Sequence, residues 1–337
     1  MSCRKYGRQS FYLERKPIIR SWASTVGKKE AEGPLAEYFD IKQEETYFGE
    51  KTWEQAENKM QHLTLNRLKQ KASITNEDID VLFSGDLLNQ CIGSSFILSG
   101  TKIPYLGIYG ACSTMAESLI LATMSVESGY ANNAVAMTSS HFAASERQYR
   151  FPLGYGGQRP PYSQWTVTGA GAALISRDGH GPKVKACTIG SVIDMGIADA
   201  NNMGAAMAPA ALDTISAHFS DFGYTAQDYD LIVTGDLGHL GKELLLSLAR
   251  RKGISFGGKL VDCGTLIYDL NKQDVHSGGS GCGCSAVTLC GYLLDQLSKQ
   301  KVQNILFCGT GALLSPTSVQ QGLPISSVSH AVSITGE

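Results

Sequence analysis

Charged residues are scarce in this sequence. Asp, Glu, Lys and Arg together make up 18% of its 337 residues, whereas a typical globular domain contains about 25%. A deficit of this size suggests that part of the surface is covered by a partner, by a second copy or by a membrane face. The formal net charge is −2, so the chain has no overall positive field of the kind that attracts nucleic acid.

Long hydrophobic runs are missing as well. No stretch approaches the roughly 18 consecutive apolar residues that a membrane-spanning helix needs. Residues 1–32 are polar and basic and contain no apolar segment of the kind found in a secretory signal peptide. We therefore expect an intracellular protein that is soluble or that meets a membrane only peripherally.

The nine cysteines follow neither a disulfide nor a zinc pattern. Their number is odd, and they are too sparse for the disulfide framework of a small secreted protein, which favours free thiols in a reducing compartment. Cys282 and Cys284 are separated by one residue, whereas zinc ligands are usually separated by two to four. The sequence thus indicates no metal and no cofactor.

One segment of the sequence occurs twice. Residues 75–87 read TNEDIDVLFSGDL, and residues 225–237 read TAQDYDLIVTGDL. Similarity at this distance indicates duplicated units that share a core. Apolar strands alternate with helical patterns such as that of residues 53–70, which indicates parallel sheets covered by helices on both faces. We expect an α/β fold of two lobes, residues 1–180 and 181–337.

Cys112 is the most prominent candidate for chemistry. It follows an apolar strand and Gly110, which permits a tight turn, and it precedes a helical pattern rich in Ala, Met and Leu. A thiol at a helix N-terminus lies near free backbone N–H groups and the positive end of the dipole, which favour the thiolate of a nucleophile. The alternative is a small cysteine buried in the core, the commonest fate of this residue type.

Two histidines follow strands near the expected site. His141 ends the strand that begins near Ala134, and His239 follows the repeated strand of the second lobe. Because sites in such sheets gather at the carboxyl ends of strands, either imidazole could reach Cys112 as an acid or base. A histidine at a strand end can equally be a solvated loop residue.

Residues 145–165 have the composition of a loop that binds anions. Arg147, Arg150 and Arg159 alternate with aromatic residues, including Trp165. Guanidinium groups bind carboxylates in bidentate pairs, and aromatic rings stack on flat ligands. A lid or a dimer contact would explain the same composition.

Two further segments could line a pocket. Residues 202–210 are small and apolar, which also fits the start of an amphipathic helix, and the glycines of the last core strand could offer backbone N–H donors to an oxyanion. The candidates from these segments are Asn202, Met207, Pro209, Gly309 and Gly311.

The motifs as a whole resemble a known family. The duplicated lobe with Gly-Ala-Cys-Ser at a strand–helix turn resembles the thiolase fold, and residues 165–172 resemble the Gly-rich strand entry of its ketoacyl synthase III branch. Four longer stretches are similar to the stage V sporulation protein AD family: TSSHFAASERQYRFPL, QRPPYSQWTVTGAGAA, NMGAAMAPAALDTI and DVHSGGSGCGCSAVTLCGY. The resemblance covers about residues 10–335. It implies a thiolase-like α/β fold with two pseudo-symmetric lobes in five layers (αβαβα).

The resemblance also implies a function. It implies a protein that binds dipicolinic acid and is required for its uptake into the developing spore. The implied partners are other proteins of the same sporulation operon at the spore inner membrane, together with a second copy in a homodimer. A scaffold for those membrane proteins is compatible with this role.

The enzymes of the fold suggest an alternative, an acyltransferase or condensing enzyme that uses Cys112. Their sites resemble Cys-His-Asn or Cys-His-Cys. Here Gly235 and Asp236 stand where the second-lobe histidine is expected, and Gly278 and Gly279 stand where the asparagine is expected. A thiol without these partners gives little rate enhancement, so the departures favour binding over turnover.

Overall fold

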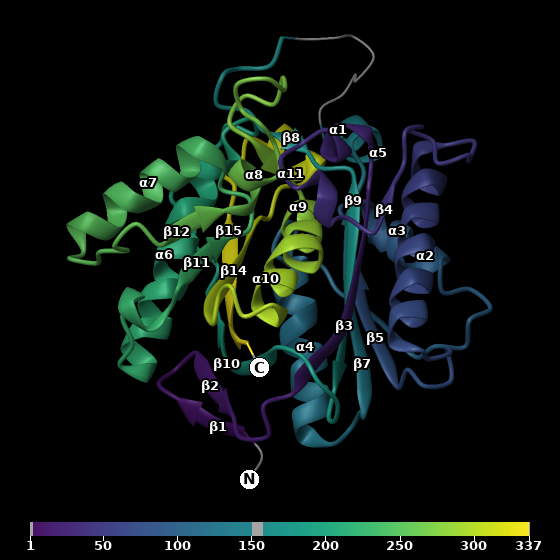
Figure 1. Ribbon diagram of the computed structural model, residues 1–337. Coiled ribbons are helices and arrows are strands. Elements are labelled where there is room, and N and C mark those ends of the chain that lie inside the picture. Colours follow the sequence, from purple (N-terminus) through teal and green to yellow (C-terminus); the bar gives the residue numbers. More distant parts are fainter. Residues whose placement is uncertain (1–2, 150–157, 337) are drawn as a thin grey trace.

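The computed structural model describes residues 3–149 and 158–336 and has five layers (Figure 1). Two helices form the central layer and are flanked on each side by half of a large mixed sheet. The outer faces of the two halves are covered by helices, α2 on one side and α6 and α7 on the other. This arrangement confirms the expected α/β fold with two lobes in five layers.

The sheet runs continuously through both halves. Its order is β12-β11-β14-β15-β10-β3-β9-β7-β5-β6, and β10 meets β3 at the single pair Lys183↔Ile18. The first half contains β3 (Ile18–Val26), β5 (Val81–Gly85), β6 (Tyr105–Gly107), β7 (Asn133–Ser140) and β9 (Gly169–Ser176). The second half contains β10 (Lys183–Ile189), β11 (Leu231–Thr234), β12 (Leu260–Asp262), β14 (Asn304–Ala312) and β15 (Ser327–Thr335).

Short strands complete the sheets at their margins. The hairpin of β1 (Cys3–Tyr6) and β2 (Ser10–Leu13) pairs with β10, and β4 (Ile41–Lys42) pairs with β3. A separate parallel pair is formed by β8 (Trp165–Thr166) and β13 (Gly279–Ser280).

The helices are α1 (Lys28–Ala31), α2 (Trp53–Ala72), α3 (Ile92–Phe96), α4 (Thr114–Ser128), α5 (Phe142–Tyr149), α6 (Met203–Phe222), α7 (Gly238–Arg251), α8 (Cys263–Leu266) and α11 (Pro316–Gln320). The second central helix is continuous through α9 (Cys282–Val287), a π-helical turn η5 (Thr288–Leu293) and α10 (Leu294–Ser298). In the part of the chain that the structure describes, no helix combines the length and hydrophobicity needed to cross a bilayer.

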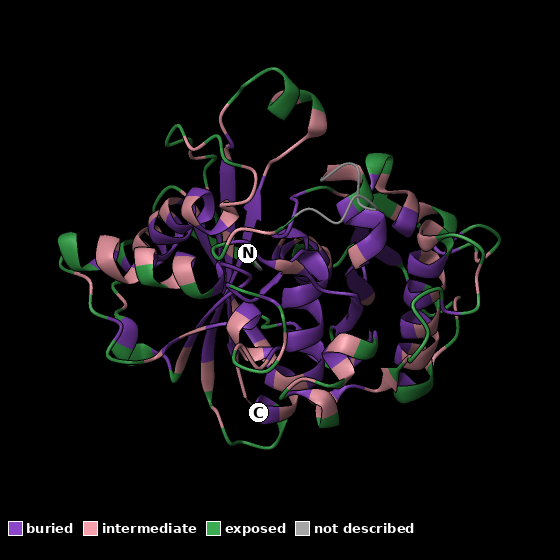
Figure 2. Ribbon diagram, turned by 90° about the horizontal axis from the view of Figure 1, so that it is seen from above, coloured by how far each residue is buried: buried purple, intermediate pink, exposed green. Residues whose placement is uncertain are grey.

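The central helices α4 and α9 are apolar nearly all round and are buried (Figure 2). Met115 and Leu119 of α4 are fully buried between the two halves of the sheet. Gly171 on β9 allows α9 to pack closely, since a Cβ there would lie 2.5 Å from the carbonyl oxygen of Ala286. The Gly-rich strand of the sequence is therefore a packing surface for the second central helix.

The repeated segment folds in the same way in both lobes. The Asp80 carboxylate accepts backbone N–H groups at the start of β7 at 2.7 and 3.0 Å. The Asp230 carboxylate does the same at the start of β14, with the same two distances. Each aspartate thus ties a short strand to its longer parallel neighbour, which places the duplication in the structure as well as in the sequence.

The interpretation of residues 145–165 as one loop is wrong at both ends. Residues up to Tyr149 belong to α5, and Trp165 begins β8. The helix follows directly from β7, whose last residue Ser140 donates its hydroxyl to the carbonyl oxygen of Val167 at 2.7 Å. This contact ties the entry of α5 to the chain that follows β8.

Candidate functional site

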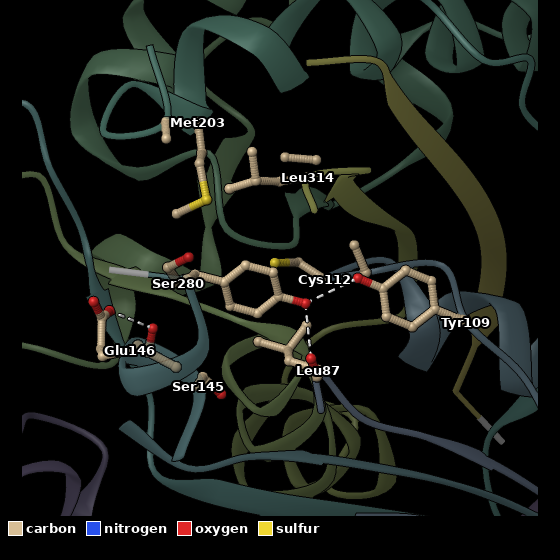
Figure 3. Close-up of a pocket in the computed structure, with 13 residues that line it drawn as sticks. Leu87, Tyr109, Cys112, Ser145, Glu146, Met203, Ser280 and Leu314 are labelled. Atoms are coloured by element: carbon tan, nitrogen blue, oxygen red, sulfur yellow. Dashed lines mark hydrogen bonds between the residues drawn. The ribbon is translucent and has the colours of Figure 1, made fainter. Parts of the chain in front are cut away.

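A cavity lies between the two lobes above the start of α4 (Figure 3), and its space amounts to about 510 Å³ when the open solvent at its mouth is included. Side chains from both lobes line it. They are Leu87, Tyr109, Ala111, Cys112, Ser145, Glu146, Tyr149 and Thr166 from the first lobe, and Ala200, Met203, Ser280, Ala312 and Leu314 from the second.

Cys112 is positioned by a strained turn. Ala111 has φ of +49°, in the left-handed region that is costly for a residue with a side chain. The hydroxyl of Thr114 donates to the carbonyl oxygen of Ala111 at 2.6 Å, and that of Ser113 donates to Gly110 at 2.7 Å. These bonds hold the turn in place and fix the thiol at the floor of the cavity.

The Cys112 thiol is buried and protonated. Only 5% of the residue is exposed. Burial, followed by the nearby Asp236 carboxylate and Cys282 thiol, raises the pKa of Cys112 well above its ordinary value. The expectation of a thiolate from the helix N-terminus is therefore wrong, because desolvation and a neighbouring acid outweigh the dipole.

Asp236 lies beside Cys112, and the sequence analysis did not select it as a site residue. Its carboxylate accepts the Thr310 hydroxyl at 2.8 Å and the backbone N–H of Gly281 at 2.9 Å. Burial raises its pKa to about 6, while hydrogen bonds from Cys112 and Thr310 lower it. The repeat could have revealed it, since Asp236 is the aspartate of the second Gly-Asp-Leu.

Two tyrosines form one wall of the cavity. The Tyr149 hydroxyl donates to the carbonyl oxygen of Leu87 at 2.7 Å and lies 3.2 Å from the Tyr109 hydroxyl (Figure 3). Burial raises the pKa of Tyr109 to about 12, so the phenol stays neutral at physiological pH. The wall offers flat apolar surface and hydroxyl groups.

A buried acid lies on the opposite side of the cavity. Glu146 on α5 accepts the hydroxyl of Thr166 at 2.9 Å, and only 4% of the residue is exposed. Ser145 and Ser280 add hydroxyl groups to the same lining. Polar groups therefore face one another across an otherwise apolar chamber, which suits a ligand with a flat body and polar ends.

The two candidate histidines do not line this cavity. The imidazole of His141 is buried and its Nε2 lies 2.9 Å from the carbonyl oxygen of Thr46. His239 is exposed at the start of α7 and lines a separate open groove with Tyr162 and His276. The structure therefore brings neither imidazole into the Cys112 cavity.

The basic and aromatic candidates of residues 145–165 that the structure describes also contact protein groups outside the cavity. Arg147 forms an ion pair with Glu54, and Arg159 pairs with Asp274 at 2.8 Å. Trp165 stacks on Phe142 with ring centroids 3.8 Å apart, and the Arg159 guanidinium lies 4.8 Å from the centre of its indole. These three side chains contact other protein groups rather than the cavity, and Arg150 lies outside the described residues.

The second-lobe candidates surround the cavity without entering it. Asn202 caps α6 by accepting the backbone N–H of Ala205, Met207 is buried in the core, and Pro209 lies within the helix. Met203, one residue after the cap, is the one whose side chain reaches the cavity. Met207 lies four residues later on the same face of α6, one turn further from the cavity, where it packs in the core.

Gly309 and Gly311 pack against the cysteine turn. A Cβ at Gly311 would lie 2.3 Å from the carbonyl oxygen of Gly110, and one at Gly309 would lie 2.7 Å from the side chain of Ala116. Glycine is therefore needed where β14 passes the start of α4. Across residues 3–149 and 158–336, no group of three His, Cys, Asp or Glu side chains is placed to hold a metal ion.

The layers and the cysteine turn define a thiolase-type fold, and solved structures share it. 3-Oxoacyl-[acyl-carrier-protein] synthase III from Aquifex aeolicus VF5 matches with a TM-score of 0.58 and 13% identity, over 95% of this chain and 99% of that chain. A variant of OleA from Xanthomonas campestris matches with a TM-score of 0.61 and 13% identity, over 96% and 98%. Identities this low establish the fold alone.

The sequence comparison goes further. The profile of the stage V sporulation protein AD family matches residues 7–335. Stage V sporulation protein AD of Bacillus subtilis (strain 168) is 43% identical over 326 residues, which span 97% of this chain and 96% of the relative. The chain therefore belongs to the stage V sporulation protein AD family, and its role lies in sporulation.

Proposed function

We propose that the chain binds dipicolinate in the cavity above Cys112 and serves its uptake into the developing spore. The observation that carries the proposal is a cavity between the two lobes at Cys112, whose thiol is buried and has a raised pKa. A site kept for turnover needs a nucleophile that can ionise. A site kept for binding needs only its shape and its polar groups.

The cavity suits a flat ligand with polar groups at its edge. Tyr149 offers a ring face, and the Ser145 hydroxyl, which has no hydrogen-bond partner among the described residues, can donate to a ligand oxygen. A pyridine dicarboxylate has one aromatic ring and four carboxylate oxygens, so it can use both. Arg150 stays the predicted cationic partner of its carboxylates.

Acyl transfer is the second candidate, and the strained turn at Ala111 favours it. A backbone held in a costly conformation beside a potential nucleophile is typical of functional sites. Against it, no described residue of the cavity lining is a histidine, and the neighbour of Cys112 is an acid. Incubation with acyl-CoA donors, followed by intact-protein mass measurement, tests it; an adduct lost in Cys112→Ala would favour transfer over binding.

Titration calorimetry with dipicolinate tests the binding proposal. We expect saturable heat with the wild type and much weaker heat with pyridine-2-carboxylate, which lacks one carboxylate. Ala200→Trp places an indole at the cavity mouth from a loop and should abolish binding. Ala198→Trp, on the same loop but outside the lining, is the matched control and should bind normally.

The outcomes separate the claims. No heat with the wild type would overturn the proposal. Binding that persists in Ala200→Trp would move the ligand to another site. Loss of binding in both Trp variants would show damage to the loop, and a Tyr149→Leu variant would then decide, with an expected loss of about 3- to 10-fold for one ring contact.

We also propose that two copies pair through the free edge of β6, and that membrane proteins of the same operon are further partners. Phe96 and Leu106 are exposed at or near this edge, by 68% and 56%. An exposed apolar edge strand is a template for pairing. Light scattering should show a dimer that Leu106→Asp dissociates, while Val192→Asp, an exposed control elsewhere, leaves it intact.

A further inference from the structure

Positive charge is concentrated at one end of a chain that is acidic overall. Residues 3–16 contain five basic residues and one acidic residue, whereas the net charge of the whole chain is −2. These residues form the β1–β2 hairpin and the loop that leaves it (Figure 1). We call this region the basic hairpin; its cations are Arg4, Lys5, Arg8, Arg15 and Lys16, and all five are exposed.

The cations of the basic hairpin are not paired with acids. Among the described residues none of the five forms an ion pair, although three acids are near: the Glu127 carboxylate accepts the backbone N–H of Arg15 at 3.1 Å, the Asp221 carboxylate lies against Gly7, and Glu14 precedes Arg15. Arg4 lies 5.2 Å from the centre of the Tyr6 ring. The five exposed cations outnumber these acids, which leaves a local excess of positive charge available to a partner.

An exposed aromatic residue stands beside these cations. The Arg15 guanidinium lies 3.8 Å from where a Cβ on Gly129 would be, and the next residue, Tyr130, is 73% exposed. Tyrosine beside Lys and Arg is the combination found at the surface of lipid bilayers, where the ring sits among the headgroups. Tyr130 thus adds an observation that charge alone does not give.

The basic hairpin lies far from the cavity. Arg15 contacts the carboxyl end of α4, while Cys112 precedes its amino end. Fifteen residues of α-helix rise by about 22 Å. A surface bound at the hairpin therefore leaves the cavity open, and the two sites can be tested separately.

A flat anionic surface fits this distribution better than nucleic acid. An extended polyanion tracks cations along a groove, but here they are gathered at one end of a molecule whose remainder is acidic. A bilayer meets only that end. Another basic cluster, Arg250 to Lys252, ends α7, where cations are explained by the helix dipole.

We propose that the basic hairpin is the docking surface of this protein for a membrane rich in anionic phospholipids. This proposal goes beyond ligand binding and does not depend on it. Clusters of four to eight Lys or Arg bind such membranes, and each contributes about fivefold in affinity, which corresponds to about 1 kcal/mol. Long-range attraction between exposed charges is screened by salt, so binding is expected to weaken as ionic strength rises.

The test is co-sedimentation of the full chain with vesicles of phosphatidylglycerol and phosphatidylcholine. We expect binding at low salt, little binding to vesicles of phosphatidylcholine alone, and release at high salt. A variant with Arg4→Gln, Lys5→Gln and Arg8→Gln should bind about 100-fold more weakly. Its response to dipicolinate in calorimetry should equal that of the wild type.

The matched control removes the same charge elsewhere. A variant with Arg250→Gln, Arg251→Gln and Lys252→Gln should sediment like the wild type. Equal weakening of both variants would show an effect of net charge and overturn the proposal. So would equal binding to neutral vesicles, or a higher affinity of the hairpin for RNA than for anionic vesicles in competition.

Discussion

Asp86 and Asp236 occupy the same position in the two copies of the repeated segment, yet their carboxylates face different partners. Asp86 accepts three hydrogen bonds within its own lobe, from the backbone N–H of Leu88 and from the N–H and hydroxyl of Ser94. Asp236 accepts the backbone N–H of Gly281 at the start of the second central helix, and it also contacts the thiol of Cys112 in the other lobe. The duplicated segment thus forms the same turn twice, and the aspartate of the second copy is the one that raises the pKa of Cys112.

Each of these aspartates also has a second buried acid beside it. In the first lobe Glu57 of α2 lies near Asp86, and burial followed by the Asp86 charge raises the pKa of Glu57 well above its ordinary value. In the second lobe Asp262 of β12 lies near Asp236, and burial raises its pKa to about 7. Both lobes therefore contain buried acids with raised pKa values, and Asp236 is the one among these four that raises the pKa of Cys112.

The largest expected effect concerns these protons. Because the pKa of Asp262 is about 7 when folded and near 3.8 when unfolded, the folded state retains a proton that the unfolded state releases. The contribution of Asp262 to the free energy of unfolding should therefore be fully present below about pH 4 and should fall as pH rises to about 7, by on the order of 3 kcal/mol. Urea unfolding across that range measures the fall.

Asp262→Asn removes the ionisation and should flatten the curve between pH 4 and 7. An unchanged slope in this variant would place the proton on another group. Glu57→Gln is the matched variant of the first lobe, and it should flatten the curve too, since its pKa is also raised.

The next largest expected effect is a loss of stability, without a loss of ligand binding, when Asp86 is replaced. Asp86→Ala removes the acceptor of three buried hydrogen bonds and should lower the free energy of unfolding by about 2 kcal/mol, because the donors of Leu88 and Ser94 lose their partner. Relief of its repulsion with Glu57 keeps the loss below the sum of the bonds. Urea unfolding at pH 7 is the measurement, and dipicolinate titration of the folded protein should match the wild type.

The rate of alkylation at Cys112 should also distinguish Asp236 from Asp86. The Asp236 carboxylate helps to raise the pKa of Cys112, so Asp236→Asn should lower that pKa and speed alkylation by iodoacetamide about tenfold for each unit. Asp86→Asn should leave the rate at Cys112 unchanged. Cys3 is exposed and should label faster than Cys112 in every variant; a rate at Cys112 that both substitutions change equally would refute the assignment.

The sequence was sufficient for features that depend on local pattern. The repeat predicted two lobes, the apolar strand and Gly110 predicted the turn at Cys112, and the helical period of residues 53–70 predicted α2. Each of these depends on neighbours in the chain. The same reasoning placed a site at Cys112, because sites in such sheets gather at the carboxyl ends of strands.

The sequence could not predict features that depend on contacts between residues far apart in the chain. Arg147 and Trp165 have the composition of a ligand clamp, but Glu54 and Phe142 occupy them, and those contacts exist only once α2 and β8 are packed. The pKa of Cys112 followed the same rule: the helix start is visible in the sequence, whereas its burial beside Asp236 is not. The type and local position of a residue suggest a function, but the contacts that form on folding determine whether the side chain is available for it.

The smallest expected effect tests where the two lobes still agree. Asp80 and Asp230 each accept two backbone N–H groups at the start of a parallel strand, with matching distances of 2.7 and 3.0 Å. Both are exposed, so water replaces part of what is lost, and each Asp→Ala substitution should lower the free energy of unfolding by about 1 kcal/mol. The two losses should agree within about 0.5 kcal/mol and should add in the double variant, because the sites share no partner. Urea unfolding of the two single variants and the double variant measures these losses. If the losses at Asp80 and Asp230 differ by more than about 1 kcal/mol, the same hydrogen-bond geometry does not contribute the same stability in the two lobes.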